Sequence, residues 1–328
     1  MSTGGETLST ATPPTDASSP DDTRDLHAFL QKTSRTFALT IPLLPEPTRT
    51  EVGVAYLLFR IIDTFEDAIH WPPARRVETL ARFVTLVGGP PDEAASLIDE
   101  CAREPPVDHP GYRELLREIP LVLRAFRELQ PGAREPIRRH LGRSAEGMSH
   151  FVDRSAASQR LELESIEDLR DYCYAVAGIV GEMLTELYLV GRPSLAGVAD
   201  ELRSRAAAFG EGLQLVNILK DARADADQGR VYLPRQASTR EVIALAQRDL
   251  AQAAAYTETL RAAGAELGLV AFNAFIAKLA VANLNLLRDK GLGAKLSRLQ
   301  VASIGAEVMS ALGHRDPLFA ELSSSPAA

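Results

Sequence analysis

Apolar residues recur at three- and four-residue spacing along most of the chain, which is the pattern of amphipathic α-helices. One such helix ends before Pro72, and its apolar positions are Val54, Leu57, Leu58, Ile61 and Ile62. The same pattern predicts helices over 111–129, 133–152, 165–190, 196–226, 237–263, 266–289 and 293–313. Few stretches alternate with period two, and β-branched runs are short. The pattern therefore predicts an all-α domain of about ten or more helices without a fixed repeat.

The composition changes at both ends of the chain. Residues 1–24 consist mainly of Ser, Thr, Pro, Gly and Asp, so burial cannot offset the entropy cost of ordering them. The last residues, which include Ser323-Ser324-Ser325-Pro326, have the same character. We predict a disordered tail over 1–24, a single folded domain over 25–316 and a flexible tail over 317–328.

Length, charge and cysteine content exclude several classes of protein. A chain of 328 residues, 45% of them apolar, can bury a core without disulfides, and Cys101 and Cys173 are too few for a disulfide framework. The net charge of −8 argues against nucleic acid as a partner. No apolar run approaches the ~20 residues of a membrane span, since Glu182 interrupts the best one around 175–184. The N-terminus lacks the pattern of a secretory signal, so we expect a soluble cytoplasmic protein.

The segment 60–67 places two carboxylates on one helix face. Asp63 and Asp67 are four residues apart, and like charges at this spacing repel each other. They also adjoin the apolar positions of a helix that we expect to be buried. A cation between the carboxylates would stabilise the arrangement, whereas a solvated acidic face near a helix end is the alternative.

A second helix carries a longer polar stripe. Asn217, Asp221 and Asp225 lie four residues apart in turn and therefore share one helix face. Two stripes of oxygen ligands on separate helices suit Mg²⁺, which commonly bridges to phosphate groups of a substrate. Arg60 and Lys220 could complete a diphosphate site by direct charge pairing.

Four segments that contain these residues follow one another in a distinctive order. They are Ser34-Arg35-Thr36-Phe37, then 56–67, then 171–182, and finally 214–225 followed by Arg230-Val231-Tyr232-Leu233-Pro234. Each resembles a motif of the squalene and phytoene synthases, the head-to-head prenyl transferases. The resemblance covers about residues 30–290. It implies a single-domain helical bundle of the isoprenoid-synthase type with a central apolar cavity.

Within this family the chain is most similar to the squalene synthases. Their aspartate motif resembles Asp63-Thr64-Phe65-Glu66-Asp67, and their Gly-Met-x-x-Phe segment resembles 147–151. One departure concerns a Pro-Gln pair that many eukaryotic squalene synthases carry in the helix equivalent to 272–285. This chain has no proline from 235 to 316, so we expect a different floor of the pocket.

The resemblance implies that two molecules of farnesyl diphosphate are joined head to head. The first product is presqualene diphosphate, and hydride from NADPH then converts it to squalene. The alternatives within the family stop at presqualene diphosphate or make phytoene or dehydrosqualene. A terpene cyclase is less favoured, because cyclases usually have Ser or Thr and Glu in the second motif, where this chain has Asn217, Asp221 and Asp225. A non-catalytic assembly protein is less favoured because all four motif aspartates are present.

The resemblance also assigns roles to residues. The implied Mg²⁺ ligands are Asp63, Asp67, Asn217, Asp221 and Asp225. The implied substrate-binding residues are Ser34, Arg35, Phe37, Tyr56, Arg60, Gln214, Asn217, Lys220 and Arg230. The four aspartates count as catalytic, together with Tyr172 or Tyr174, of which we favour Tyr172. Phe37, Tyr56 and Phe65 could present aromatic faces to a carbocation, with core packing as the alternative.

Further expectations concern cofactors and partners. The resemblance implies Mg²⁺ and NADPH as cofactors and prenyl diphosphates as substrates. Lys295 and Arg298 resemble a basic segment near NADPH, although a solvated helix face is the simpler interpretation. An insoluble product makes peripheral membrane contact plausible, and both a monomer and a homodimer stay open.

Overall fold

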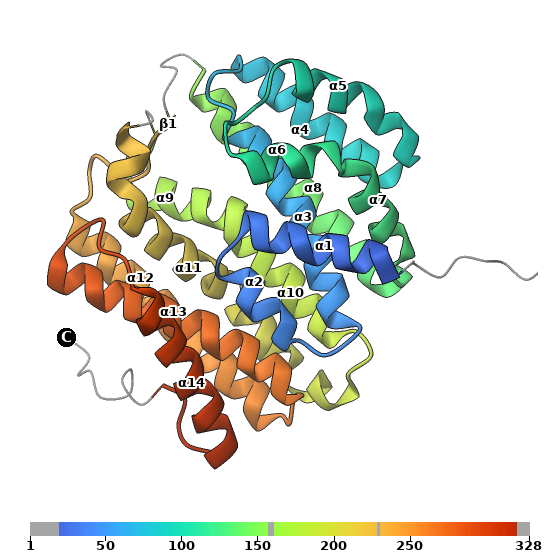
Figure 1. Cartoon of the computed structure of the whole chain (residues 1–328). Coiled ribbons are helices and arrows are strands. Elements are labelled where there is room, and N and C mark those ends of the chain that lie inside the picture. Colours follow the sequence, from blue (N-terminus) through green and yellow to red (C-terminus); the bar gives the residue numbers. More distant parts are fainter. Residues whose placement is uncertain (1–19, 157–160, 228–229, 320–328) are drawn as a thin grey trace, which may run out of the picture.

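The computed structural model describes residues 20–156, 161–227 and 230–319, and the predictions for 1–19 and 320–328 fall outside this part (Figure 1). The helices are α1 (Pro20–Thr33), α2 (Phe37–Thr40), α3 (Thr48–Glu66), α4 (Pro73–Gly88), α5 (Ala95–Arg103), α6 (Pro110–Arg117), α7 (Ile119–Glu128), α8 (Pro131–Arg154), α9 (Ile166–Cys173), α10 (Ile179–Leu189), α11 (Ala199–Asp227), α12 (Thr239–Ala262), α13 (Leu267–Lys290) and α14 (Arg298–His314). Short 3-10 turns cover Ile41–Leu43, Pro91–Ala94 and Pro193–Val198, and Tyr174–Gly178 forms a π-helical turn. The prediction of an all-α fold is confirmed.

The only strands in the described ranges form a two-residue parallel pair. β1 (Leu161–Glu162) lies beside β2 (Arg230–Val231), with Leu161 opposite Arg230. The pair ties the segment before α9 to the segment after α11. It therefore fixes the position of Arg230 near the end of the acidic helix.

The predicted tails are partly helical or packed. α1 begins at Pro20, inside the segment expected to be disordered to residue 24. At the other end, Leu318 and Phe319 are buried against the core, so the predicted flexible tail does not begin at 317. Local composition did not indicate this contact, because it depends on an apolar surface supplied by the rest of the bundle.

The bundle is built around α3, which crosses its centre in Figure 1. Leu57, Leu58, Ile61 and Ile62 of α3 are fully buried, as their spacing predicts. α4 to α7 cover one side of this helix, and α11 to α14 form the other part of the bundle (Figure 1). The two acidic stripes therefore lie on helices from different parts of the bundle.

Small residues let the central helices approach closely. A Cβ atom added to Gly210 of α11 would lie 2.0 Å from the carbonyl oxygen of Ala177, and one added to Gly181 of α10 would lie 2.0 Å from that of Ala206. Glycine is therefore required at both positions. The close contact holds α11 against the π-helical turn and α10.

One helix of the described part is long and apolar enough to cross a membrane by length and composition. This is α13, whose best window has a mean hydropathy of 1.7, and 72% of that window is buried inside the bundle. The sequence interpretation missed it because Asn273 and Lys278 interrupt the apolar run. A mostly buried core helix satisfies the same criteria.

Candidate active site

The predicted site residues gather around two connected cavities. The larger one, with a volume of about 850 Å³, is called the aspartate cavity. Of the predicted residues it is lined by Ser34, Arg35, Phe37, Arg60, Asp63, Asp67, Tyr172, Gln214, Asn217, Lys220, Asp221, Asp225 and Arg230. The smaller, apolar cavity has a volume of about 200 Å³ and is lined by Tyr56. All the implied metal and substrate residues, together with Tyr172, thus reach one of the two cavities.

The first acidic stripe lies at the C-terminal end of α3. Asp63 is held by Arg60, whose Nη1 atom lies 3.4 Å from its Oδ2 atom. Burial raises the pKa of Asp63 to about 6, although Arg60 opposes this effect and Asp67 adds to it. Burial and the negative charge of Asp67 also raise the pKa of Glu66, which lines the same cavity. A cation at this end of α3 would favour the charged carboxylates.

The second acidic stripe lies on α11 among lysines. The Nζ atom of Lys220 donates to Oδ1 of Asn217 at 2.7 Å and lies 3.5 Å from Oδ2 of Asp221. The Nζ atom of Lys295 lies 2.8 Å from Oδ1 of Asp221. Lys295 was expected on a solvated helix face, but it lies in the loop before α14 and pairs with the site.

Arg230 joins the two acidic helices. Its Nη1 donates to Oδ1 of Asp67 at 2.5 Å, and its Nη2 donates to Oδ1 of Asp225 at 3.2 Å. Burial lowers the pKa of the guanidinium, but Asp67 and the other nearby acids more than offset this. Burial raises the pKa of Asp225 against the opposing charge of Arg230. Arg230 therefore neutralises one carboxylate from each helix.

The donor set of the cavity fits a hard divalent cation. Carboxylate and amide oxygens from α3 and α11 face the same space, and Mg²⁺ prefers oxygen ligands while retaining waters. Within the described ranges, no three His, Cys, Asp or Glu side chains converge closely enough to hold a metal on their own. The residues fit ions whose coordination is completed by water and by a diphosphate.

The two candidate tyrosines face different surroundings. Tyr172 lines the aspartate cavity, stacks on Tyr232 with ring centroids 4.9 Å apart, and contacts the edge of Phe151. Burial and the nearby Glu66 raise its pKa well above the usual value. Tyr174 instead donates to Glu182 and accepts from Arg143, and it lines neither cavity. This geometry favours Tyr172 as the tyrosine of the site.

The turn between α1 and α2 forms one wall of the aspartate cavity. Ser34 Oγ accepts a hydrogen bond from the backbone N–H of Phe37 at 3.0 Å, which fixes the turn around Arg35. The ring of Phe37 lies against Tyr56, with centroids 5.2 Å apart. Phe37 lines both cavities and so marks the passage between them.

The apolar cavity extends from this passage into the bundle. Its inner wall includes Phe209 of α11, Tyr256 of α12 and Phe272 of α13. Asn273 also lines it, and its Nδ2 donates to the carbonyl oxygen of Leu269 at 2.8 Å. Phe65 does not reach either cavity, because it packs against Trp71 and Phe83 in the core.

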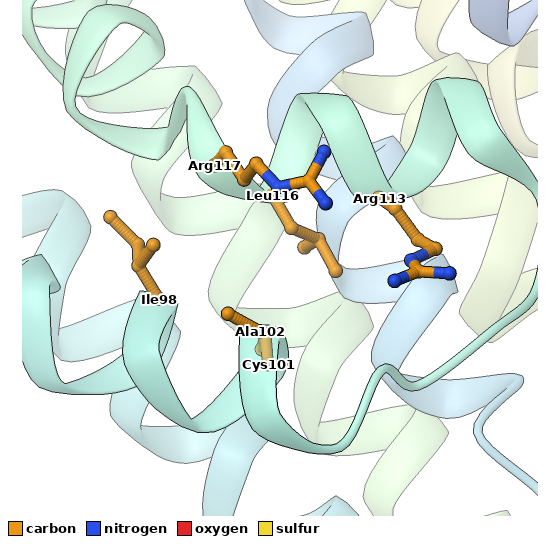
Figure 2. Close-up of a pocket in the computed structure, with 6 residues that line it drawn as sticks. All are labelled: Ile98, Cys101, Ala102, Arg113, Leu116 and Arg117. Carbon is orange, nitrogen blue, oxygen red and sulfur yellow. The ribbon is translucent and has the colours of Figure 1, made fainter.

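A further pocket lies away from both cavities, between α5 and α6 (Figure 2). It has a volume of only about 10 Å³ and is lined by Ile98, Cys101, Ala102, Arg113, Leu116 and Arg117. Space of this size holds no more than a water molecule. The pocket therefore contributes no substrate site.

Two residues of the aspartate cavity, Glu66 and Tyr112, and the contact of Lys295 with Asp221 were not predicted from the sequence. Glu66 carried a signal, since it lies three residues after Asp63 on the same helix. Tyr112 of α6 and the contact of Lys295 with Asp221 carried none, because both are brought to the site only by tertiary packing.

Comparisons with known proteins agree with this arrangement. A family model described as squalene/phytoene synthase matches residues 30–312. Squalene synthase of Schizosaccharomyces pombe is 30% identical over 224 residues, which cover 67% of this chain and 46% of that relative. Botryococcus squalene synthase of Botryococcus braunii is 29% identical over 213 residues, 64% of this chain and 42% of the relative. The chain thus spans about half the length of the curated relatives it matches.

Solved structures show the same fold. The complex of TcSQS with the ligand E5700 is 25% identical, has a TM-score of 0.75, and is matched over 94% of this chain and 93% of that one. A dehydrosqualene synthase in complex with a ligand has a TM-score of 0.58 at 21% identity, over 90% of this chain and 97% of that one. The second likeness concerns the fold alone. With the family model matched over most of its length and both aspartate motifs facing one cavity, the chain belongs to the squalene/phytoene synthase family.

Proposed function

We propose that the protein is a squalene synthase that joins two farnesyl diphosphates head to head and reduces the product with NADPH. The observation that carries the proposal is the continuity of the aspartate cavity with the apolar cavity, which share Phe37, Arg60 and Asp63. A charged mouth that leads into an apolar space matches a diphosphate joined to a hydrocarbon chain. The relatives named squalene synthase, at about 30% identity, support the same substrate.

The residues of the mouth bind and activate the diphosphate in this proposal. Asp63, Asp67, Asn217, Asp221 and Asp225 would hold Mg²⁺ in the aspartate cavity, beside the bound diphosphate. Bound Mg²⁺ neutralises the negative charge that develops as a diphosphate leaves. Arg60, Lys220 and Arg230 pair with phosphate oxygens, and Arg35 with the Ser34 turn closes the other wall.

The inner residues protect the reacting carbons. The apolar cavity excludes water, which would otherwise trap an allylic cation as an alcohol. The ring of Phe37 offers a π face at the passage between the cavities. The Tyr172 hydroxyl, buried beside Tyr232, stays protonated, so its oxygen lone pairs would steady a cation at the reacting end of the chain.

NADPH supplies hydride to the second half-reaction when it is bound. Lys295, next to Asp221, places positive charge beside the cavity mouth, which suits the phosphates of a dinucleotide, and Arg298 follows three residues later at the start of α14. We also propose that the chain forms a single catalytic domain. It would act in the cytoplasm or at a membrane surface, since an apolar product favours contact with a membrane.

Product analysis tests the proposal. Purified protein is incubated with farnesyl diphosphate and Mg²⁺, with and without NADPH, beside Asp67→Asn as the inactive control. Squalene that forms only with NADPH is the expected result. Presqualene diphosphate in both reactions would show that only the first half-reaction takes place. Dehydrosqualene in both reactions would show that the protein makes a different final product. No turnover with farnesyl or geranylgeranyl diphosphate would overturn the proposal.

A further inference from the structure

Arg60 lies between two aromatic rings at the mouth of the site. Its guanidinium carbon is 5.6 Å from the ring centroid of Tyr56 and 5.3 Å from that of Tyr112. Tyr56 belongs to the same helix, one turn earlier, but Tyr112 comes from α6. Both distances are within the range at which a cation is attracted to an aromatic face.

The Tyr56 side of this arrangement is fixed by hydrogen bonds. The hydroxyl of Tyr56 donates to the carbonyl oxygen of Thr33 at 3.0 Å and accepts from Nε of Arg60 at 3.3 Å. Nη1 of Arg60 lies 3.4 Å from Asp63. Arg60 also lines the aspartate cavity, so its guanidinium can donate to an oxygen atom of a ligand there.

The Tyr112 side is fixed by the close approach of α6 to α1. A Cβ atom at Gly111 would lie 2.7 Å from the carbonyl oxygen of Lys32, so only glycine permits this approach. The Nζ atom of Lys32 also pairs with Glu114 at 2.6 Å. The ring of His109 lies against Tyr112 from the same end of α6, with centroids 4.2 Å apart. Tyr112 is thus held over Arg60 by contacts that do not involve the acidic helices.

We propose that Tyr112 is a positioning residue that orients Arg60 toward the diphosphate of the substrate. The substrate belongs to the function proposed above, on which this inference rests. A long arginine side chain loses considerable conformational freedom when it is fixed. The two rings restrict the guanidinium plane before the ligand arrives, so less freedom is lost on binding. Tyr112 acts through its ring, and its hydroxyl is not required.

Binding of inorganic pyrophosphate with Mg²⁺, measured by titration calorimetry, tests the proposal without any turnover. Tyr112→Leu should weaken binding about tenfold, whereas Tyr112→Phe, which keeps the ring, should stay within about threefold of the parent protein. Arg113→Leu is the matched control on α6, because Arg113 faces the small pocket beside α5 (Figure 2). Thermal unfolding of each variant reports whether the fold is retained.

A double-mutant cycle separates positioning from general packing. In an Arg60→Met background, Tyr112→Leu should cause no further loss of pyrophosphate binding, and kcat/KM with farnesyl diphosphate should show the same coupling. The proposal would be overturned if Tyr112→Leu weakened pyrophosphate binding equally in the parent and Arg60→Met proteins. It would also be overturned if Tyr112→Phe weakened binding as much as Tyr112→Leu. If the protein binds pyrophosphate but converts no prenyl diphosphate, the proposed function is refuted, while the double-mutant cycle of pyrophosphate binding still tests the role of Tyr112. If it does not bind pyrophosphate, both proposals fail.

Discussion

Arg230 pairs with Asp67 and Asp225 at the same time, at 2.5 and 3.2 Å, although these aspartates belong to helices far apart in the sequence. The guanidinium thereby stands between the two acidic motifs. Its position is fixed by the short β1–β2 pair, in which Arg230 lies opposite Leu161. Arg230 reduces the repulsion between Asp67 and Asp225. Without it, the proposed metal ions alone would have to neutralise these carboxylates.

Replacing Arg230 by Met should therefore destabilise the metal-free protein. Two partly buried carboxylates would lose their shared partner, at a cost of about 2 kcal/mol, which lowers Tm by a few degrees. Mg²⁺ alone should raise Tm more in the variant than in the parent protein, because the cation takes over the neutralisation of Asp67 and Asp225. Thermal unfolding with and without Mg²⁺ measures both effects. Arg203→Met is the control, since Arg203 pairs with the exposed Asp200 at 3.0 Å; equal Tm changes in the two variants would contradict the argument.

The helices and their acidic faces could be predicted from the sequence because both depend on local spacing. The stripe Asn217, Asp221 and Asp225 requires only a helix of the observed length. The contact of Lys295 with Asp221 depends on how the α13–α14 loop folds back over α11, and no local pattern encodes that path. The burial of Leu318 likewise depends on an apolar surface formed elsewhere in the chain.

Removing the charge of one motif aspartate should abolish activity without unfolding the bundle. Asp67→Asn and Asp221→Asn keep the size of the side chain but remove an anionic ligand, so kcat should fall about a hundred- to a thousandfold. Far-ultraviolet circular dichroism should show unchanged helix content. Asp200→Asn, at a fully exposed position of α11, is the control. Full activity in an Asp67→Asn/Asp221→Asn double variant would refute the metal assignment.

The two tyrosines of the α9 region should respond differently to loss of the hydroxyl. Tyr172→Phe should lower kcat about a hundredfold with little change in Tm, because the ring still stacks on Tyr232. Tyr174→Phe should keep its activity but lose about 1 kcal/mol of stability, because it loses its hydrogen bonds with Glu182 and Arg143. Steady-state kinetics and denaturant unfolding of both variants distinguish them. The reverse pattern would move the role to Tyr174.

The contact between α11 and the π-helical turn should tolerate no additional methyl group. In Gly210→Ala the new Cβ would lie 2.0 Å from the backbone oxygen of Ala177, so α11 would have to move. We expect a loss of about 3 kcal/mol or more, with weaker substrate binding because Gln214 and Asn217 lie on the next turns. Gly197→Ala is the matched control, since a Cβ there meets nothing within 4 Å. Chemical denaturation that gave similar values for the two variants would contradict this packing.

Asp249 should make the stability of the protein depend on pH. It is buried on α12, its Oδ2 has no hydrogen-bond partner in the described ranges, and burial raises its pKa from 3.8 to about 6. Arg170 and Arg248 oppose this shift, and Asp249 in turn helps to raise the pKa of the buried Glu211.

The direction of this pH effect follows from proton binding. Between pH 3.8 and about 6 the folded protein binds more protons at Asp249 than the unfolded chain, so the free energy of unfolding falls as the pH rises and then levels off. Asp249→Asn removes the ionised form and should therefore stabilise the protein at pH 7 by about 1 kcal/mol, after allowance for screening by solvent, but not at pH 4. Urea unfolding at both pH values measures the difference. The control Asp200→Asn should leave the free energy of unfolding unchanged at both pH values. If Asp249→Asn stabilised the protein equally at pH 4 and pH 7, ionisation of Asp249 would not be the cause.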